Sequence, residues 1–492
     1  MKYSAQSKIP HPPVPLLLLA LLVLGLPTAP ALLGQETPGA GNLEGAWVGE
    51  LALPGGQTLP LVFHLTEEAD GSLGATMDSP LQGARGIPVD EVGYVDGVLT
   101  LSLSSLQARF QGEVTGDAIV GQWLQGGMEV PLRLEPAQEG VAAARPQDPE
   151  PPLPYQSEDV RYANPEAGIE LAGTLTLPEG EGPFPAVALI TGSGAQDRDQ
   201  ALMGHRPFLV LSDHLTRAGI AVLRSDDRGV GESGGDFDTA TSWDFAGDAH
   251  AAVTYLRSRP EVDPEAVGLV GHSEGGLIAP MVAVEWGGVD FLVLLAGPAL
   301  PGTEILRMQA EAIARAMGAD DADVAQAREI QEELFRIILD EGDPEARVAQ
   351  VRSHLTDVLA GADPDEMAAQ GIPPGEEDAW VEGQLRMVQG EWFRTFLAHD
   401  PRTHLRQVTV PVLGLFGELD LQVPWEANRE AMAQALSDGG NADVTLTVLP
   451  SLNHLFQTAE TGAPTEYGQI QETFAPVALE AVSDWILSRA RK

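Results

Sequence analysis

Cysteine is absent from this sequence of 492 residues. Its absence excludes disulfide bonds, and it excludes a lipoprotein signal, which needs a cysteine at its cleavage point. Stability must therefore come from the packing of apolar side chains. Hydrophobic residues make up 43% of the chain, which is enough for two or three domains with cores of their own.

Positive charge is scarce. Lysine occurs only at positions 2, 8 and 492, and 28 Lys and Arg residues face 72 Asp and Glu residues, for a formal net charge of −44. A surface this negative repels phosphate groups, so we predict no binding to nucleic acids or anionic membranes. The acidity fits a solvated surface in a protein from a GC-rich genome, or adaptation to high salt. It identifies no substrate.

Long hydrophobic runs are also scarce. The run "LLLLALLVLGL" follows Lys2 and Lys8, ends at Pro27, and precedes the small residues Ala29 and Ala31. Eleven apolar residues are few for a helix that spans a bilayer, whereas this order is typical of a secretory signal peptide. We predict a signal peptide at residues 1–34, no membrane span after its removal, and a periplasmic or secreted protein. An uncleaved anchor is the alternative.

Residues 43–135 alternate between apolar and polar positions, as in "TLPLVFHLTE" and "GVLTLSLSS", with glycine-containing turns every eight to twelve residues. This pattern predicts a small antiparallel β domain. Its aromatic residues suit core packing better than a ligand-binding face; they include Trp47, Tyr94, Phe110 and Trp123. The proline-rich residues 136–154 have no periodicity and predict a linker without regular structure.

The pattern changes at residue 155. Continuous apolar segments alternate with helical ones; the segments are "FPAVALITG", "GIAVLRSDD", "AVGLVGHS", "DFLVLLAG" and "VPVLGLFGELD". Such strands predict an α/β fold, with a doubly wound, mostly parallel sheet covered on both faces, over residues 155–492. Residues 300–405 contain no strand-like run but several amphipathic patterns, which predict a helical cap inserted between two strands.

One serine lies in the setting of a nucleophile. Residues 271–275, "GHSEG", match G-x-S-x-G, with an apolar strand before them and a helical stretch after them. In this strand–turn–helix arrangement the serine adopts a strained backbone, and side chains in place of the flanking glycines would collide with neighbouring elements. We predict that Ser273 is the nucleophile. An ordinary tight turn is the alternative.

A serine hydroxyl needs a base, and in this architecture an acid and then a histidine follow the serine along the chain. Only His454, of ten histidines, lies beyond the strand that should carry the acid. Asp420 lies at the tip of that strand and would hold the imidazole in the required tautomer. Glu418 is the second choice for the acid and is better suited to stabilising the loop.

Acyl transfer also needs donors for the developing oxyanion. One should be the backbone N–H of Glu274, because the side chain at that point of the turn points away from the hydroxyl. The other should come from "GSGAQDRD", residues 192–199, with the N–H of Ser193 first and that of Gly194 second. The charged residues 197–199 are expected to brace this loop through mutual ion pairs.

No cofactor or metal site is predicted. Gly229, Gly231 and Gly234 match G-x-G-x-x-G, but Asp226 and Asp227 precede them and would oppose a pyrophosphate, and the match lies outside the first βα unit of the sheet. The sequence has no Walker A lysine, no H-E-x-x-H motif and no cysteine cluster.

Six motifs over about residues 155–490 together resemble the α/β-hydrolase superfamily and, within it, exported bacterial serine esterases. They are "GSGAQDRD", "DDRGVGESGG", "GHSEGG", "WFRTFLAHDP", "GELDLQVP" and "LNHLFQ". The resemblance implies that Ser273, Asp420 and His454 form a catalytic triad and that the substrates are short-chain carboxylic esters. Relatives usually have proline where this chain has Ala195, which bears on loop rigidity. The β domain resembles a module found before such hydrolases, without an implied activity.

The leading prediction is a serine carboxylesterase that acts on a small-molecule ester through an acyl-enzyme. An aminopeptidase-like serine peptidase and an acyl thioesterase remain open, because a triad does not encode the leaving group. A different class also remains open: a binding module whose β domain holds a ligand while the hydrolase part is inert. Otherwise the β domain would pack on the hydrolase domain.

Overall fold

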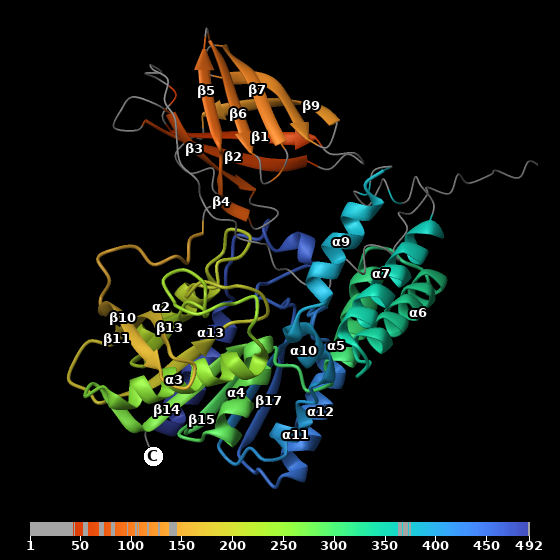
Figure 1. Ribbon diagram of the computed structural model, residues 1–492. Coiled ribbons are helices and arrows are strands. Elements are labelled where there is room, and N and C mark those ends of the chain that lie inside the picture. Colours follow the sequence, from red (N-terminus) through yellow and green to blue (C-terminus); the bar gives the residue numbers. More distant parts are fainter. Residues whose placement is uncertain are drawn as a thin grey trace, which may run out of the picture.

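In the part of the chain that it describes, the computed structural model contains two β-sheets and a set of helices (Figure 1). It describes residues 43, 45–52, 58–67, 73–79, 84–95, 97–103, 106, 108–115, 118–125, 128–136, 145–362, 367, 372 and 375–490. The predicted signal peptide, residues 1–34, lies outside these ranges, as do residues 137–144 of the predicted linker. None of the described helices is both long enough and apolar enough to cross a membrane.

The first sheet is antiparallel, with strand order β4-β3-β2-β1-β9-β8-β7-β6-β5. Its strands are β1 (Gly45–Ala52), β2 (Thr58–Glu67), β3 (Leu73–Ser79), β4 (Ala84–Pro88), β5 (Glu91–Val95), β6 (Val98–Leu103), β7 (Ala108–Thr115), β8 (Ala118–Gln125) and β9 (Met128–Pro136). On β7 the residues Ala108 and Phe110 are buried, while Arg109 and Gln111 between and beside them are exposed. This alternation is the one from which the all-β fold was predicted, and that prediction is confirmed.

The aromatic residues of this sheet lie in its core. The rings of Phe63 and Phe110 are stacked at 6.2 Å, and Trp123 lies 6.2 Å from Phe63. Trp47 is also buried, and Tyr94 packs against the same cluster. These side chains therefore stabilise the sheet and do not form an open binding face.

The second sheet is mixed, with strand order β10-β11-β13-β12-β14-β15-β16-β17. Its strands are β10 (Gln156–Asn164), β11 (Ile169–Leu177), β12 (Phe184–Ile190), β13 (Ala221–Ser225), β14 (Val262–His272), β15 (Phe291–Leu295), β16 (Val412–Gly417) and β17 (Val444–Leu449). The six strands from β13 to β17 in this order are parallel, and β10 and β11 add an antiparallel edge. The five apolar segments predicted as strands are β12 to β16.

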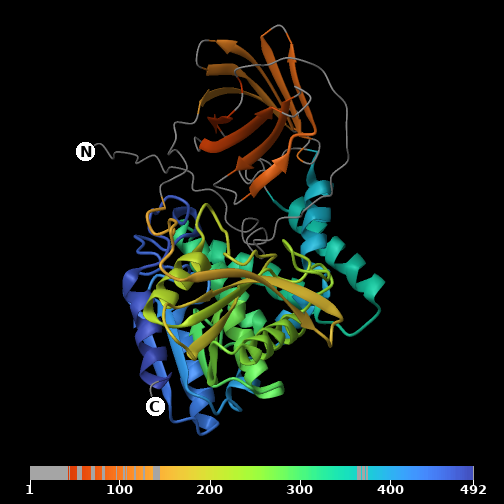
Figure 2. The same ribbon diagram turned by 90° about the vertical axis from the view of Figure 1, so that its left-hand side faces the viewer.

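Helices cover both faces of this sheet (Figure 2). One core cluster joins the sheet to α3 (Ser242–Ser258), α4 (Glu274–Glu285) and α12 (Trp425–Asp438). A second cluster joins the other face to α2 (Pro207–Ala218) and α13 (Pro476–Ala490). Because both faces are buried, the central strands are apolar at nearly every position, as in "FLVLL" of β15.

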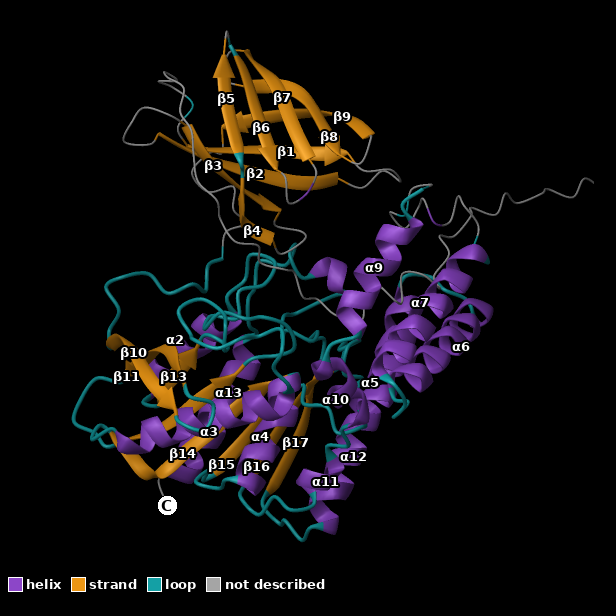
Figure 3. Ribbon diagram, viewed as in Figure 1, coloured by secondary structure: helices purple, strands orange, loops and turns teal. Residues whose placement is uncertain are grey.

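Along the sequence, a group of helices separates β15 from β16, and these helices lie to one side of the sheet (Figure 3). They are α5 (Gly302–Ala316), α6 (Asp321–Ile338), α7 (Pro344–Ala360), α9 (Glu377–Val388), α10 (Glu391–Ala398) and α11 (Arg402–Leu405). Helix α6 begins at a capping box in which the Asp320 carboxylate accepts the N–H groups of Ala322 and Asp323. Its residues Leu334 and Ile338 are buried. The predicted helical insertion is confirmed, and its described residues contain no strand.

The second half of the predicted linker lies against the part of the chain that forms the second sheet. Residues 145–154 form no helix or strand. The Arg145 guanidinium donates to the backbone carbonyls of Met203, Gly204, Gly468 and Ile470. This fixes the segment before β10 to two loops at the carboxyl edge of the sheet.

Candidate active site

The predicted nucleophile lies at a sharp turn. Strand β14 ends at His272 and α4 begins at Glu274, so Ser273 alone connects them, with φ 54° and ψ −118°. A positive φ at a residue with a side chain is strained and is found where function requires it. A Cβ on Gly271 would lie 2.0 Å from the carbonyl oxygen of Gly275, and one on Gly275 would lie 2.2 Å from that of Ile190. Both flanking glycines are therefore required by close backbone contact, as predicted.

The predicted base and acid are in direct contact. Nδ1 of His454 lies 2.9 Å from Oδ2 of Asp420, and both side chains are buried. The other oxygen of Asp420 accepts the backbone N–H groups of Gln422 and Val423. Since the carboxylate is held at both oxygens, it can fix the imidazole with Nδ1 protonated and leave Nε2 free to accept a proton.

The second choice for the acid has the structural role expected of it. The Glu418 carboxylate accepts the backbone N–H of Ser451. This bond ties the loop after β17 to the end of β16. Glu418 lies two residues before Asp420, the residue that contacts His454. Glu418 thus supports the loop that carries the histidine.

Ser273 and His454 line one pocket of about 100 Å³. Ser193 and Glu274 line the same pocket, so it brings together both predicted sources of oxyanion donors, the nucleophile and the base. The loop of Ser193 lies against the nucleophile, because a Cβ on Gly192 would be 3.2 Å from Cβ of Ser273. Gly194 lines the neighbouring cavity, which favours Ser193 of the two candidates.

The far wall of the pocket comes from the cap. Helix α5 contributes Ile305, Leu306 and Gln309, and α10 contributes Trp392 and Phe396. None of these five side chains is charged. The wall opposite the nucleophile is therefore largely apolar.

The loop after β12 is braced from the "DDRG" segment. The Asp227 carboxylate accepts the Thr191 hydroxyl at 2.7 Å and the backbone N–H of Gln196 at 3.0 Å. Burial raises the pKa of Asp227 to about 8. Its side chain thus holds both ends of the turn that contains Ser193.

The charges within this loop have other partners than predicted. Arg198 pairs with Asp226, Oδ2 lying 2.6 Å from Nη2, and Asp199 pairs with Arg224. Asp197 accepts backbone N–H groups of its own loop. The expectation of mutual ion pairs among residues 197–199 was wrong, because each charge has a closer partner on another segment or on the backbone.

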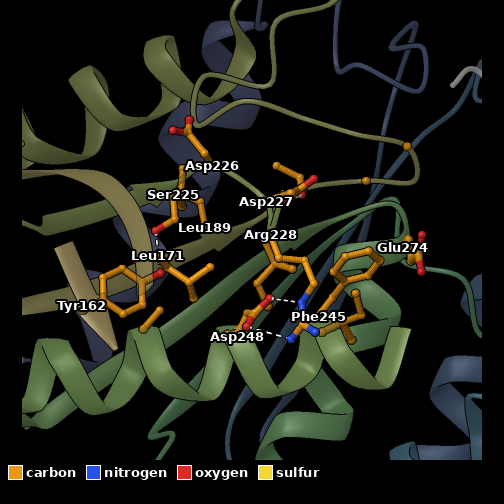
Figure 4. Close-up of a pocket in the computed structure, with 17 residues that line it drawn as sticks. Tyr162, Leu171, Leu189, Ser225, Asp226, Asp227, Arg228, Phe245, Asp248 and Glu274 are labelled. Carbon is orange, nitrogen blue, oxygen red and sulfur yellow. Dashed lines mark hydrogen bonds and ion pairs between the residues drawn. The ribbon is translucent and has the colours of Figure 1, made fainter. Parts of the chain in front are cut away.

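A second, smaller cavity of about 50 Å³ lies behind this loop (Figure 4). In it the Arg228 guanidinium binds the Asp248 carboxylate of α3, and the Tyr162 hydroxyl contacts Ser225. Gly231 has φ 54°, and a Cβ there would lie 2.6 Å from Oδ2 of Asp226. The glycines of the G-x-G-x-x-G match therefore serve a tight turn beside acidic side chains.

Sequence reasoning missed His272. Its ring is buried 4.8 Å from that of His454, Nε2 donates to the His454 carbonyl at 2.9 Å, and Nδ1 accepts from Gln200. Burial, reinforced by the nearby His454, lowers the pKa of His272 to about 3, so the ring is neutral. The residue positions the backbone of His454. The one feature of the sequence that could have indicated this role is that His272 directly precedes Ser273, at the end of the strand.

The described residues contain no group of three or more His, Asp and Glu side chains placed to hold a metal ion. The site has two parts: a strained serine at a strand–helix turn, and a histidine–aspartate pair at the carboxyl ends of β16 and β17. Residues 207–365, which include the serine, match the family described as serine aminopeptidase, S33.

Over that segment the chain is similar to α/β-hydrolases. The chain is 29% identical over 314 residues to esterase EstD of Thermotoga maritima, over 62% of this chain and 65% of that one. It is 34% identical over 116 residues to thiohydrolase aneE of Aspergillus aculeatus, over 23% of this chain and 33% of that one. The alignments thus span slightly less than two thirds of the first relative and a third of the second.

Two solved structures are also similar to this chain at low sequence identity. The Pyrococcus furiosus esterase Pf2001 is 16% identical, with a TM-score of 0.43, over 68% of this chain and 92% of that one. Est1E of Butyrivibrio proteoclasticus, solved with ferulic acid bound, is 19% identical, with a TM-score of 0.39, over 68% of this chain and all of that one.

Proposed function

We propose that this protein is a serine carboxylesterase that hydrolyses short-chain carboxylic esters through an acyl-enzyme. The observation that carries the proposal is the pocket that the strained Ser273 and His454 both line, with His454 hydrogen-bonded to Asp420. The similarity to a Thermotoga esterase over 314 residues supports the same reaction type.

The proposed reaction has two halves. The Ser273 hydroxyl attacks the ester carbonyl carbon and passes its proton to Nε2 of His454, while Asp420 stabilises the imidazolium. The backbone N–H groups of Ser193 and Glu274 would bind the oxyanion. The alcohol then leaves with the proton from His454. Water, deprotonated by the same nitrogen, attacks the acyl-enzyme and releases the acid.

The pocket favours small, uncharged acyl groups. Its volume of about 100 Å³ is small beside ordinary ligand pockets of about 300–1,000 Å³. Its cap wall, formed by α5 and α10, carries no acidic side chain, and the carboxyl of Glu274, which also lines the pocket, is already bound to Ser242 and Trp392. This argues for an ester substrate over the amino terminus of a peptide.

Thioester hydrolysis is the second candidate, because the chain resembles a thiohydrolase over 116 residues. Oxygen esters, thioesters and amino-terminal amides with the same butyryl or aminoacyl group should therefore be compared in one assay. We expect the highest kcat/KM for the oxygen ester.

The proposal also covers the export of the protein and its division into domains. We propose that residues 1–34 direct export to the periplasm or medium, that residues 43–135 form the β domain, that 136–154 link it to the hydrolase domain at 155–492, and that the cap spans about 300–405. The β domain's core packing supports a structural role for its aromatic residues.

The proposal is tested with Ser273→Ala in the purified full chain, on p-nitrophenyl butyrate. We expect kcat to fall by about 10⁴-fold or more while the folded state is retained, since the nucleophile is lost. Thr356→Ala, which alters an exposed hydroxyl on α7, is the matched control. Wild-type turnover by Ser273→Ala would refute the proposal.

A further inference from the structure

The carboxyl group of Glu274 lies next to the nucleophile and contacts three separate segments. Its Oε1 accepts the Ser242 hydroxyl at 2.6 Å and the indole N–H of Trp392 at 2.8 Å. The Ser193 side chain lies beside this carboxyl and partly offsets the rise in its pKa that burial causes. Glu274 is 3% exposed. The three partners come from the start of α3, the cap helix α10 and the loop after β12.

The contact with Trp392 fixes the cap wall of the pocket. The Trp392 ring stacks on Phe396, with ring centroids 5.4 Å apart and planes at 21°, and both rings line the pocket. The indole N–H is the polar group of this wall that reaches the elbow. Without the carboxyl it would lose its partner inside the protein, which favours another orientation of the ring.

The contact with Ser193 acts on the other side of the pocket. Ser193 carries one proposed oxyanion donor on its backbone, and Glu274 carries the other. The interaction between the Ser193 side chain and the Glu274 carboxyl therefore joins the two residues whose N–H groups must point at the same oxygen. Small displacements of such donors reduce turnover strongly.

We propose that the Glu274 side chain is a positioning residue that couples the cap to the oxyanion hole. It holds Trp392 at the acyl pocket and Ser193 at the hole, so a single carboxyl sets both acyl-chain binding and turnover. This inference rests on the proposed esterase function and adds to it a residue that acts on specificity. The G-x-S-x-G pattern leaves the residue after the serine unspecified. In this protein that residue is Glu274, and its side chain positions Trp392 and Ser193.

The test compares single changes at the three contacts on p-nitrophenyl acetate and butyrate. Trp392→Phe removes the indole N–H and keeps a ring; we expect KM for butyrate to rise about fivefold to tenfold, with kcat changed less than about threefold. Ser193→Ala keeps the backbone N–H and removes the hydroxyl; we expect kcat to fall about fivefold to tenfold, with little change in KM. Glu274→Ala should show both effects.

Two further variants distinguish a positioning role of Glu274 from a general loss of structure: a conservative replacement of Glu274, and a double variant that tests whether the effects add. Glu274→Gln keeps an acceptor oxygen for Trp392 and a side chain that can still hydrogen-bond to Ser193, and we expect it to recover kcat/KM to within about threefold of the wild type. In the Glu274→Ala background, Trp392→Phe should change KM less than about twofold, because the contact is already lost. Trp286→Phe, which removes an indole N–H on an exposed contact with Glu166, is the matched control.

The proposal is overturned if Trp392→Phe and Ser193→Ala both change KM and kcat as little as the control does, or if Trp392→Phe adds its full effect to Glu274→Ala. If Glu274→Ala does not fold, the proposal is still tested by the other two variants: Trp392→Phe should change KM, and Ser193→Ala should change kcat. Failure of the esterase proposal is seen separately, as Ser273→Ala that keeps its activity in the same assay.

Discussion

The two walls of the pocket differ in how their side chains are held. On the sheet side, Asp420, His454 and His272 each have named hydrogen-bond partners and lie at the carboxyl ends of parallel strands or on the loops that follow them. On the cap side, Ile305, Leu306 and Phe396 are apolar, and Trp392 makes the hydrogen bond to Glu274.

This difference assigns separate tasks to the two walls. A network of buried hydrogen bonds fixes reacting groups within a fraction of an ångström, which proton transfer requires. An apolar wall binds acyl chains by area and shape, with little demand on direction. Changes on the sheet side should therefore reduce kcat, and changes on the cap side should alter KM and acyl preference.

The largest effect is expected at the acid. Asp420→Asn keeps the shape of the side chain but removes the charge that stabilises the imidazolium, so kcat on p-nitrophenyl butyrate should fall about 10³- to 10⁴-fold. Glu418→Gln is the matched control, with the same chemical change two residues away, and should lose less than about threefold. A loss below tenfold in Asp420→Asn would remove Asp420 from the triad.

A smaller effect is expected at the residue that positions the base. His272→Ala removes the donor to the His454 carbonyl, and kcat should fall about 10- to 100-fold with KM nearly unchanged, because the base is displaced. Initial rates over a range of ester concentrations measure both constants. If KM rises while kcat is kept, His272 shapes the substrate site instead.

On the cap side, Leu306→Ala should lengthen the acyl chain that the pocket accepts. Leu306 is 7% exposed and lines the pocket, so the change opens space beside the acyl group. We expect kcat/KM for octanoate relative to butyrate to rise about tenfold, with kcat on acetate changed less than threefold. Val348→Ala, in the cap but outside this pocket, should leave the preference as it is. An unchanged preference in Leu306→Ala would contradict the assignment of this wall.

The smallest effect on activity, with a distinct effect on stability, is expected at Asp227. Its pKa is raised from 3.8 to about 8 by burial, with nearby Glu274 and Asp248 contributing, so the folded protein holds this proton more tightly than the unfolded chain does. Stability from this group is therefore present below about pH 4 and is lost as the pH rises toward 8.

Asp227→Asn mimics the protonated form and does not titrate. As the pH rises from 5 to 8.5, the unfolding free energy of the wild type should decrease by about 1 to 3 kcal/mol more than that of Asp227→Asn. Urea unfolding at each pH measures both values. Parallel pH profiles for the two proteins would show that Asp227 ionises normally.

Much of this molecule could be predicted because its signals are local. Apolar runs of strand length predicted β12 to β16, and two-residue alternation predicted the first sheet. The glycines at 271 and 275 were identified from the turn they must allow, and the close backbone contacts around them agree.

The roles of His272 and the Glu274 carboxyl could not be predicted, because they depend on contacts between distant segments. His272 meets a carbonyl 182 positions later, and Glu274 meets an indole 118 positions later, on an inserted helix. The partners of Arg198 were missed for the same reason, since Asp226 lies on another strand end.

Covalent trapping tests the central claim most directly. A p-nitrophenyl alkylphosphonate resembles the tetrahedral intermediate and leaves a stable phosphonyl group on an activated serine. After incubation of the full chain, intact mass and peptide mapping should show one adduct per chain, on Ser273, and none in Ser273→Ala. An adduct on another residue, or no adduct on a folded and active wild-type protein, would contradict the assignment of Ser273 as the nucleophile.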